Sequence, residues 1–334
     1  MATRLRVVSG MRPTGKLHVG HFFGALKNWL KLQDEHECFF FSADWHALTT
    51  EYATPGEMKE AERDMVADWL ALGIDPTKVV LFVQSRVKQH AELALLFGMV
   101  TPIPWLERVP TYKEQQQNLT GKDLSTYGFL GYPLLQAADV AVYRATAVPV
   151  GQDQVAHLEL SREIVRRFNN LYAPEVGPKL LPEPQPLLTE HPKILGLDGR
   201  KMSKSFHNAI LLGEAEESAK KRLMTAVTDP ARVRRNDPGN PEVCPIFYLH
   251  KAYSPPETIA MVDRECRTAG IGCVDCKKAL LVNLLPALEK HRKARAEVDQ
   301  APERIDQALE DGARRANEVA EETMRDVRRA MKLE

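Results

Sequence analysis

Two histidines near the amino terminus form the first group of residues that could carry out chemistry. His18 and His21 enclose Val19 and Gly20, directly after a loop of turn formers at residues 11–16 and at the start of a helical pattern. Backbone N–H groups and the helix dipole favour phosphate at such a turn. The two imidazoles could donate hydrogen bonds to an α-phosphate, and Gly20 would let a flat base lie against bare backbone. A chance His-x-x-His sequence is the alternative.

Two lysines later in the chain form a second such group. They stand in the run Lys201-Met202-Ser203-Lys204-Ser205, after a stretch at residues 196–200 that is too rich in glycine and charge to be core. Two ammonium groups on a mobile loop could close over a pyrophosphate leaving group and stabilise the charge that develops in the transition state. A solvated basic loop is the alternative for this run on its own.

Four of the five cysteines crowd together in the last third of the chain, which favours a metal over a disulfide framework. They are Cys244, Cys266, Cys273 and Cys276, with the spacing C-x21-C-x6-C-x2-C. Four thiolates suit a [4Fe–4S] cluster, one per iron. Structural Zn²⁺ suits four thiolates equally, although such sites usually pair two short Cys-x-x-Cys knuckles and only one occurs here. Four unligated buried thiols are a third alternative, which the loop formers Gly270, Gly272 and Asp275 disfavour.

The first half of the chain predicts the elements that must position these groups. Short apolar runs at residues 5–9, 38–43 and 79–84 are typical of buried strands, and the segments between them have the apolar spacing of helices, at residues 19–30 and 57–72. Strands that alternate with helices indicate a parallel sheet with right-handed crossovers. Ligands of such sheets lie outside the carboxyl ends of the strands. The histidines follow the first strand and are therefore expected at that edge.

The second half of the chain is predicted to be helical. A charged amphipathic helix at residues 159–169 follows a turn at 150–153, and a proline-rich connection covers 174–192. After Asn208 the strand-like runs largely vanish, and apolar residues at helical spacing form one stripe from Ile305 to Met331. We therefore expect two domains, an α/β catalytic domain over residues 1–208 and a helical domain over residues 209–334.

Composition sets outer limits on the protein class. A chain of 334 residues, with 44% hydrophobic and 27% charged residues, is typical of a soluble two-domain protein. No apolar run approaches the roughly 18 residues that span a bilayer, and no export signal is evident, which predicts a cytoplasmic protein. Lys+Arg and Asp+Glu both number 45, so any nucleic-acid site must be local. One stretch, residues 219–235, carries a basic excess that includes Arg232, Arg234 and Arg235, although a solvated helix face would look the same.

The histidine motif and the lysine motif together resemble the two signature motifs of class I aminoacyl-tRNA synthetases, which implies a Rossmann-like catalytic fold. The resemblance extends through nearly the whole chain and is closest to the bacterial tryptophanyl enzymes. It rests on residues 9–15, 43–47, 132–133, 137–139, 151–154 and 157. Residues 271–278, Ile-Gly-Cys-Val-Asp-Cys-Lys-Lys, resemble the subset of that family that holds an iron–sulfur cluster.

The resemblance implies a role for each motif residue. Charge stabilisation would come from the catalytic side chains His18, His21, Lys201 and Lys204. The ATP site would comprise Arg12, Gly20, Gly151, Asp153, Met202 and Ser203. The tryptophan pocket would comprise His46, Tyr132, Asp139 and Gln154, with Asp139 at the indole N–H. The chain departs from many relatives, which have methionine, asparagine and glutamine where it has Gln136, His21 and Arg12.

The implied reaction joins tryptophan to ATP as tryptophanyl-adenylate, with Mg²⁺ on the phosphates, and then transfers the aminoacyl group to tRNA(Trp). A homodimer and a tRNA anticodon-binding role for the helical half are also implied. A tyrosyl-tRNA synthetase is the nearest alternative, because a phenol hydroxyl donates as an indole N–H does. A nucleotidyltransferase with a similar histidine motif would not need the helical half, and a non-catalytic paralogue would have lost motif residues.

Overall fold

The computed structural model of the chain describes residues 4–109, 124–188 and 194–334. Its central sheet has strands β1 (Arg6–Met11), β2 (Glu37–Ser42), β3 (Val80–Val83), β4 (Ala147–Val150) and β5 (Gln185–Leu188). They are all parallel and follow the order β3-β2-β1-β4-β5. The strand order reverses between β1 and β4, and ligands of open parallel sheets bind at such a switch point. The α/β class expected from the sequence is confirmed.

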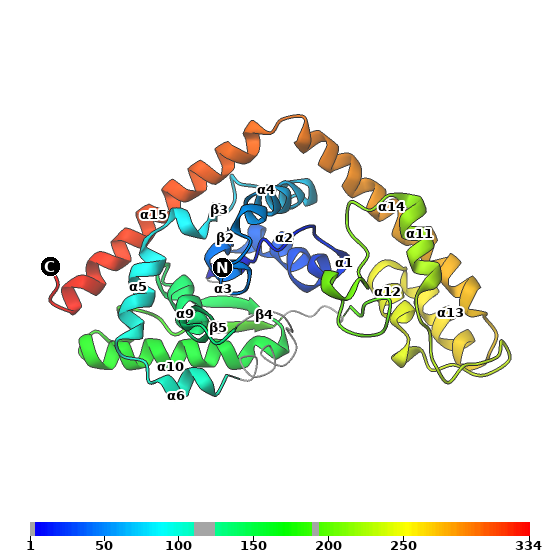
Figure 1. The fold of residues 1–334 in the computed structure, drawn as a ribbon, viewed down its shortest axis with the longest axis horizontal. Coiled ribbons are helices and arrows are strands. Elements are labelled where there is room, and N and C mark those ends of the chain that lie inside the picture. Colours follow the sequence, from blue (N-terminus) through cyan, green and yellow to red (C-terminus); the bar gives the residue numbers. More distant parts are fainter. Residues whose placement is uncertain (1–3, 110–123, 189–193) are drawn as a thin grey trace.

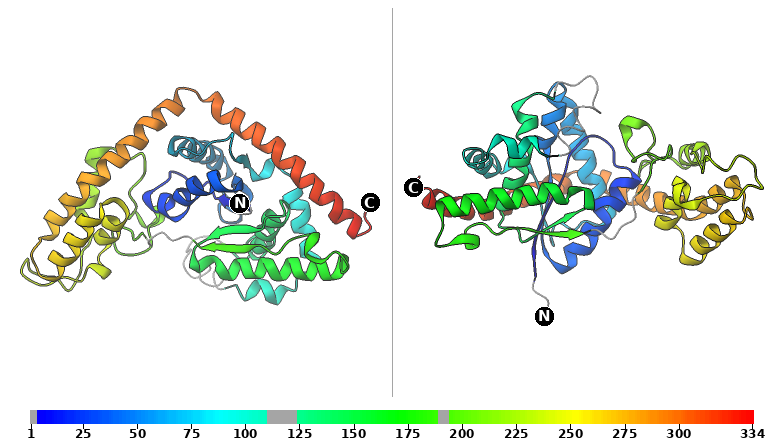
Figure 2. Two further views of the ribbon diagram at one scale, coloured as in Figure 1. Left: turned by 180° about the vertical axis from the view of Figure 1, so that it is seen from behind. Right: turned by 90° about the horizontal axis from the view of Figure 1, so that it is seen from below.

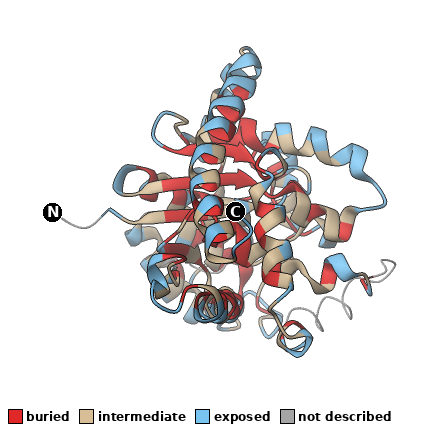
Figure 3. Cartoon of the chain, turned by 90° about the vertical axis from the view of Figure 1, so that its left-hand side faces the viewer, coloured by how far each residue is buried: buried red, intermediate tan, exposed pale blue. Residues whose placement is uncertain are grey.

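Both faces of the sheet are covered, which explains its apolar strands. In β2, Phe40 packs into one hydrophobic core, while Phe39 and Phe41 pack into the other. This alternation places a core on each side of the sheet, as is usual for parallel sheets. Figure 3 shows the resulting layer of buried strands inside partly exposed helices.

The helices of the first half cover the sheet and lead to its carboxyl edge. They are α1 (Val19–His21), α2 (Lys27–Glu35), α3 (Asp44–Glu51), α4 (Pro55–Leu72), α5 (Gln89–Gly98), α6 (Ile103–Glu107), α8 (Tyr127–Leu130), α9 (Tyr132–Ala141) and α10 (Val155–Tyr172). A π-helical turn, η1 (Phe22–Leu26), joins α1 to α2. The single amphipathic helix expected at residues 19–30 therefore contains a π-turn directly after the histidine motif, a feature frequent at functional sites.

Short 3₁₀ turns mark several loops. They are η2 (Gln84–Arg86), η3 (Gln152–Gln154), η4 (Gly177–Lys179), η5 (Lys204–Phe206) and η6 (Pro241–Val243). Two of them carry candidate site residues, because η3 follows β4 and η5 begins at Lys204.

The second half of the chain is helical after residue 208 in the described structure, as expected. Its helices are α11 (Glu216–Thr225), α12 (Pro245–Tyr253), α13 (Pro256–Arg267), α14 (Cys273–Asp299) and α15 (Glu303–Ala330). Helices α11 to α13 form a group beside the sheet domain, and α14 and α15 meet at an apex above it (Figures 1 and 2). None of the described helices is both long and apolar enough to cross a membrane.

The last helix returns to the sheet. Helix α15 packs along β3 and α5, so its apolar stripe is buried against the first half of the chain. The approach is close at Gly312, where an added Cβ would lie 1.7 Å from the carbonyl oxygen of Leu81. The edge of the sheet at β3 is therefore covered by a segment more than 200 residues away in sequence.

Strands β4 and β5 were not anticipated, because each contains a proline. Pro149 in β4 pairs with Leu187, and Pro186 in β5 pairs with Val148. Proline lacks the N–H that a central strand needs. β5 is an edge strand, and β4 pairs with β1 at one residue pair only, Val7 with Ala147. Both prolines are tolerated because few backbone hydrogen bonds join the strands on their outer sides there.

Candidate functional site

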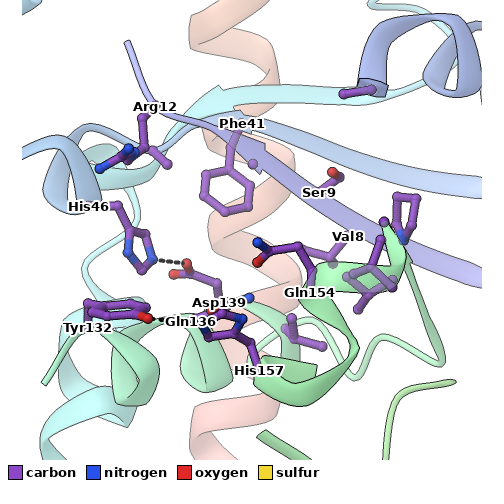
Figure 4. Close-up of a pocket in the computed structure, with 18 of the residues that line it drawn as sticks. Val8, Ser9, Arg12, Phe41, His46, Tyr132, Gln136, Asp139, Gln154 and His157 are labelled. Carbon is purple, nitrogen blue, oxygen red and sulfur yellow. Dashed lines mark hydrogen bonds and ion pairs between the residues drawn. The ribbon is translucent and has the colours of Figure 1, made fainter. Parts of the chain in front are cut away.

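A cavity of about 430 Å³ lies at the switch point of the sheet. Its walls come from the carboxyl ends of β1 and β4, from the loops that follow them, and from α3, α9 and α10 (Figure 4). Predicted site residues among its lining are Arg12, His46, Tyr132, Asp139, Gly151 and Gln154, with Gln136 and His157 beside them. The size suits a small organic molecule.

One face of α9 supplies the floor of the cavity. Tyr132, Gln136 and Asp139 all line it, and their spacing of four and three residues places them on one side of a helix. The Tyr132 hydroxyl lies 2.9 Å from Nε2 of His157 on α10. The helical spacing of these three residues in the sequence is thus enough to predict that they share one face of the helix.

Asp139 is buried and holds three hydrogen bonds. His46 donates to Oδ2 from Nε2 at 2.7 Å. Gln84 and His90 both donate to Oδ1, at 2.6 and 2.7 Å. Burial raises the pKa of Asp139, but the hydrogen bonds and charges of His46 and His90 outweigh it and hold the pKa below its ordinary value. Asp139 is therefore a carboxylate.

Among the residues that the structure describes, one acceptor position of this carboxylate stays available. Each carboxylate oxygen has two lone pairs, so Oδ1 is filled by Gln84 and His90 while Oδ2 keeps one beside His46. Asp139 lines the cavity. A bound molecule with a single N–H or O–H donor at this depth can therefore fill the last acceptor position of Asp139.

The two motif histidines stack on each other. Their ring centroids are 3.6 Å apart, and the backbone N–H of His18 donates to Nδ1 of His21 at 3.3 Å. Burial lowers the pKa of His18 to about 4, helped by the charge of Lys204. Burial lowers the pKa of His21 to about 2, with His18 and Lys204 adding to the effect. Both rings are neutral at pH 7, and His21, which accepts at Nδ1, has its proton on Nε2 for donation.

The lysine loop docks onto the loop before the histidines. The ammonium of Lys204 donates to the carbonyl oxygen of Thr14 at 2.5 Å. An added Cβ at Gly15 would lie 3.1 Å from that ammonium, and Gly15 has a φ of +99°, so glycine is required there. Met202 approaches Gly20, where an added Cβ would lie 3.4 Å from the Met202 Cβ. Burial lowers the pKa of Lys204.

Backbone pairing fixes the two motifs side by side. Val19 donates to the carbonyl of Ile210, and Leu212 donates to the carbonyl of Leu17, at 2.9 and 3.0 Å. The structure therefore brings His18, His21, Met202 and Lys204 together. Lys201 is exposed and pairs through its backbone with Leu195, and Ser203 donates from its backbone N–H to the Asn208 side chain. The side chain of Asp153 lies outside the described residues.

Asn208 is a loop-organising residue that motif reasoning did not single out. Its side-chain oxygen accepts from Ser203, and its amide nitrogen donates to Asp198 at 2.6 Å and to the Lys201 carbonyl at 3.1 Å. The side chain is buried, and Gly196 leaves the space for it, since an added Cβ would lie 2.2 Å from Nδ2. The only sequence signal was an amide residue just after the lysine motif.

The four clustered cysteines line one small cavity of about 20 Å³. Cys244 precedes α12, Cys266 lies in α13, and Cys273 and Cys276 lie in the first turn of α14. In this arrangement no three His, Cys, Asp or Glu side chains within the described ranges converge tightly enough to hold a metal ion.

The clustered cysteines nevertheless shift one another's pKa values. Burial raises the pKa of Cys276 to about 12, and the neighbouring cysteines raise it further. Burial and the other cysteines also raise the pKa of Cys244. Without a cation among them the thiols of Cys244 and Cys276 are therefore protonated, whereas a bound metal would deprotonate them.

Arg232 belongs to this cysteine cavity. Its guanidinium lies 3.9 Å from Sγ of Cys273 and donates to the carbonyls of Arg235 and Ile271, both at 2.8 Å. Arg234 and Arg235 are exposed. Of the three arginines in the predicted basic patch, Arg232 is thus partly buried and hydrogen-bonded within the protein.

A doubly covered parallel sheet, with neutral histidines and a docked lysine loop over the switch point, defines a Rossmann-like nucleotide-binding enzyme. The family model for tRNA synthetases class I (W and Y) matches residues 1–288. The tryptophan–tRNA ligase of Thermotoga maritima is 55% identical over 98% of this chain and 99% of its own length. That of Aquifex aeolicus is 44% identical over 98% of this chain and 100% of its own length.

A solved structure agrees. The crystal structure of tryptophanyl-tRNA synthetase from Campylobacter jejuni, complexed with ADP and tryptophan, matches with a TM-score of 0.84 at 31% identity. The match covers 98% of this chain and 100% of that one. The chain belongs to the class I tRNA synthetases and, within them, to the bacterial tryptophan–tRNA ligase family.

Proposed function

We propose that this chain activates L-tryptophan with ATP as tryptophanyl-adenylate and transfers the aminoacyl group to tRNA(Trp), releasing AMP and pyrophosphate. The observation that carries the proposal is the single acceptor position left on the buried carboxylate of Asp139 at the floor of the cavity. An indole N–H fills it, and an aliphatic side chain would leave it unpaired. Such a mismatch is costly enough to reject substrates by several orders of magnitude.

The remaining tryptophan contacts follow from the same cavity. His46 holds Oδ2 of Asp139 and lines the pocket. Tyr132 and Gln154 face the amino acid's ammonium group, since both offer oxygen acceptors. The half of the cavity nearer β1 and β4 takes ATP. Its ATP contacts are Arg12, Gly20, Gly151, Asp153, Met202 and Ser203.

Adenylate formation needs positioning and charge stabilisation rather than a covalent nucleophile. His18 and His21, being neutral, donate hydrogen bonds to the α-phosphate without repelling Lys204. Lys201 and Lys204 stabilise the charge that develops on pyrophosphate. Mg²⁺ bound with ATP would neutralise part of the charge on the phosphates.

Amino-acid-dependent ATP–pyrophosphate exchange tests the proposal, run with each standard amino acid. Tryptophan alone should support rapid exchange. Exchange with tyrosine that equals or exceeds exchange with tryptophan would overturn the assignment.

The helical part after residue 208 is proposed to bind the anticodon of tRNA(Trp), with Arg234 and Arg235 on its exposed surface as backbone contacts. Arg232 contributes indirectly, because it braces the carbonyl of Arg235. Charge reversal of Arg234 and Arg235 should weaken aminoacylation and reduce its salt dependence, while exchange without tRNA stays unchanged. Arg314→Glu, at an exposed position of α15, is the matched control. Unaltered aminoacylation in the double variant would refute this surface.

A [4Fe–4S] cluster is proposed at the four cysteines. The support is that all four line one cavity and that Arg232 places positive charge beside Cys273. The spacing along the chain favours the cluster over zinc, because structural zinc sites usually pair two short Cys-x-x-Cys knuckles and only Cys273 to Cys276 forms one here. The cluster would supply structural cross-linking, since this reaction transfers no electron.

Anaerobic purification tests the metal. Brown protein with broad visible absorption and equal amounts of iron and sulfide is expected. Colourless anaerobic protein with one zinc per chain would decide for zinc.

A homodimer located in the cytoplasm is also proposed. The support for the dimer is a group of exposed apolar side chains on neighbouring elements. Its members are Leu95, Met99, Ile103 and Tyr127, and Met99 follows Leu95 by about one helical turn. Tyr127 lies near Gly98, where an added Cβ would be 3.7 Å from the hydroxyl. Sedimentation should give a dimer, and Met99→Glu should shift it toward monomer. A wild-type monomer at assay concentration would refute the dimer.

A further inference from the structure

Asp139 lies at the end of a buried hydrogen-bonded chain of side chains. The other two members, His90 and Tyr143, belong to none of the motifs. Nδ1 of His90 lies 2.7 Å from Oδ1 of Asp139, and Nε2 of the same ring lies 2.7 Å from the Tyr143 hydroxyl. His90 and Tyr143 are both fully buried. Neither lines the cavity, so neither can touch the bound amino acid.

The direction of the hydrogen bond between His90 and Asp139 is fixed. A carboxylate only accepts, so Nδ1 of His90 carries a proton and donates to Asp139. Burial raises the pKa of Tyr143 well above its ordinary value, with the charge of Asp139 adding to the effect, so its hydroxyl keeps its proton. Nε2 of the same ring can meet that hydroxyl as an acceptor or as a donor, since a hydroxyl does both. Tyr143 thus holds the ring with Nδ1 directed at Asp139.

Packing holds the ring of His90 in one orientation. Its centroid lies 5.8 Å from Phe41, 6.0 Å from Phe82 and 5.2 Å from Tyr143. Tyr143 in turn stacks on Phe39 at 4.6 Å. An imidazole caged by aromatic rings cannot rotate away, so its N–H stays aimed at Oδ1.

We propose that His90, held by Tyr143, is a specificity-determining positioning residue. Together with Gln84, it fills Oδ1 of Asp139 and leaves a lone pair of Oδ2 as the acceptor that faces the substrate. Without His90 the carboxylate is free to turn and to present either oxygen, and recognition of a donor at one position weakens. This inference rests on the proposed tryptophan-activating function.

The test compares tryptophan with its analogue in which sulfur replaces the indole N–H. The analogue has nearly the same shape but donates no hydrogen bond. A hydrogen bond to a charged group contributes roughly tenfold to a hundredfold in binding, and the wild-type ratio of kcat/KM for tryptophan over the analogue should reach that range. Pyrophosphate exchange supplies both values.

In His90→Leu the ratio should fall to within about threefold of unity, mainly because tryptophan loses its advantage. His90→Asn should restore most of the ratio, since an asparagine amide nitrogen stands where Nδ1 stood and donates as it did. Tyr143→Phe keeps the ring in its packing and removes only the hydroxyl. It should lower the ratio severalfold even where His90→Leu fails to fold.

Phe97→Leu is the matched control, because Phe97 lies on the same helix as His90 and is buried in the same core without contacting Asp139. It should lower the melting temperature and leave the ratio unchanged. An unchanged ratio in folded His90→Leu, or in Tyr143→Phe, would show a purely structural role and overturn the inference alone. Wild-type protein without tryptophan-dependent exchange would instead overturn the proposed function, and the inference with it.

Discussion

Removing the ammonium of Lys204 should slow adenylate formation without affecting tryptophan binding. Lys204 does not line the tryptophan cavity but lies against Thr14, beside the histidine motif. A unit charge about 4 Å from developing phosphate charge, at an effective dielectric constant of about 20, is worth about 4 kcal/mol. Loss of one such group typically costs about 10²–10³ in kcat. We therefore expect Lys204→Ala to reduce the single-turnover rate by roughly that factor.

The assay separates binding from chemistry. Rapid-quench measurement of adenylate under enzyme excess gives the rate, and equilibrium titration with tryptophan alone gives the affinity, expected within about twofold of wild type. Lys204→Met retains the apolar stem and isolates the charge. Lys220→Ala, at a partly exposed lysine paired with Glu216 and Glu217, is the matched control. A wild-type single-turnover rate in Lys204→Ala would refute the reasoning and leave the loop as a solvated basic run.

Three further outcomes are expected. Asp139→Ala should reduce kcat/KM for tryptophan in pyrophosphate exchange at least roughly tenfold to a hundredfold, and a smaller loss would contradict the single-acceptor argument. Burial lowers the pKa of His21 from 6.5 to about 2, so as pH falls below 6.5 the unfolded chain takes up a proton that the folded chain refuses and stability declines. Urea unfolding of His21→Asn should therefore show a shallower decline between pH 6.5 and about pH 4, and an equal slope would refute the shift. Gly312→Ala should lower the melting temperature by several degrees, because the new methyl meets the Leu81 carbonyl. Gly56→Ala, with open space around it, should not.

The sequence predicted those parts of the fold that depend on local patterns of apolar residues. Continuous apolar runs gave β1, β2 and β3 within a residue or two at their ends, and helical spacing gave α4, α10 and α15. It could not give β4 and β5, because Pro149 and Pro186 weaken the strand pattern where the sheet itself is weakly bonded. Local pattern also says nothing about the surface on which a helix packs. The stripe of α15 predicted a buried face, and only the fold shows that β3 lies beneath it.

In the candidate site, too, some residues could be predicted from the sequence and others could not. Residues that form motifs, such as His18 and Lys204, were found from type and spacing. Asn208 and His90 were not, because their importance lies in partners that the fold brings to them: Asp198 and Ser203 for the one, and Asp139 and Tyr143 for the other. A lone buried histidine carries no signal in the sequence that separates it from a packing residue.

The contacts between the cysteine cavity and the lysine loop give a physical reason for the proposed metal site, far from the histidine motif. Lys277, next to Cys276, donates to the carbonyls of Met224 and Ala226 at the end of α11, at 2.9 and 2.6 Å. Earlier on the same helix, Arg222 donates to the carbonyl of His207, just beyond η5. The last turn of α11 thus contacts both the cysteine turn and the segment just after the lysine loop. A cross-link among the four thiols would fix the turn that carries Lys277, and with it the helix against which the lysine loop rests.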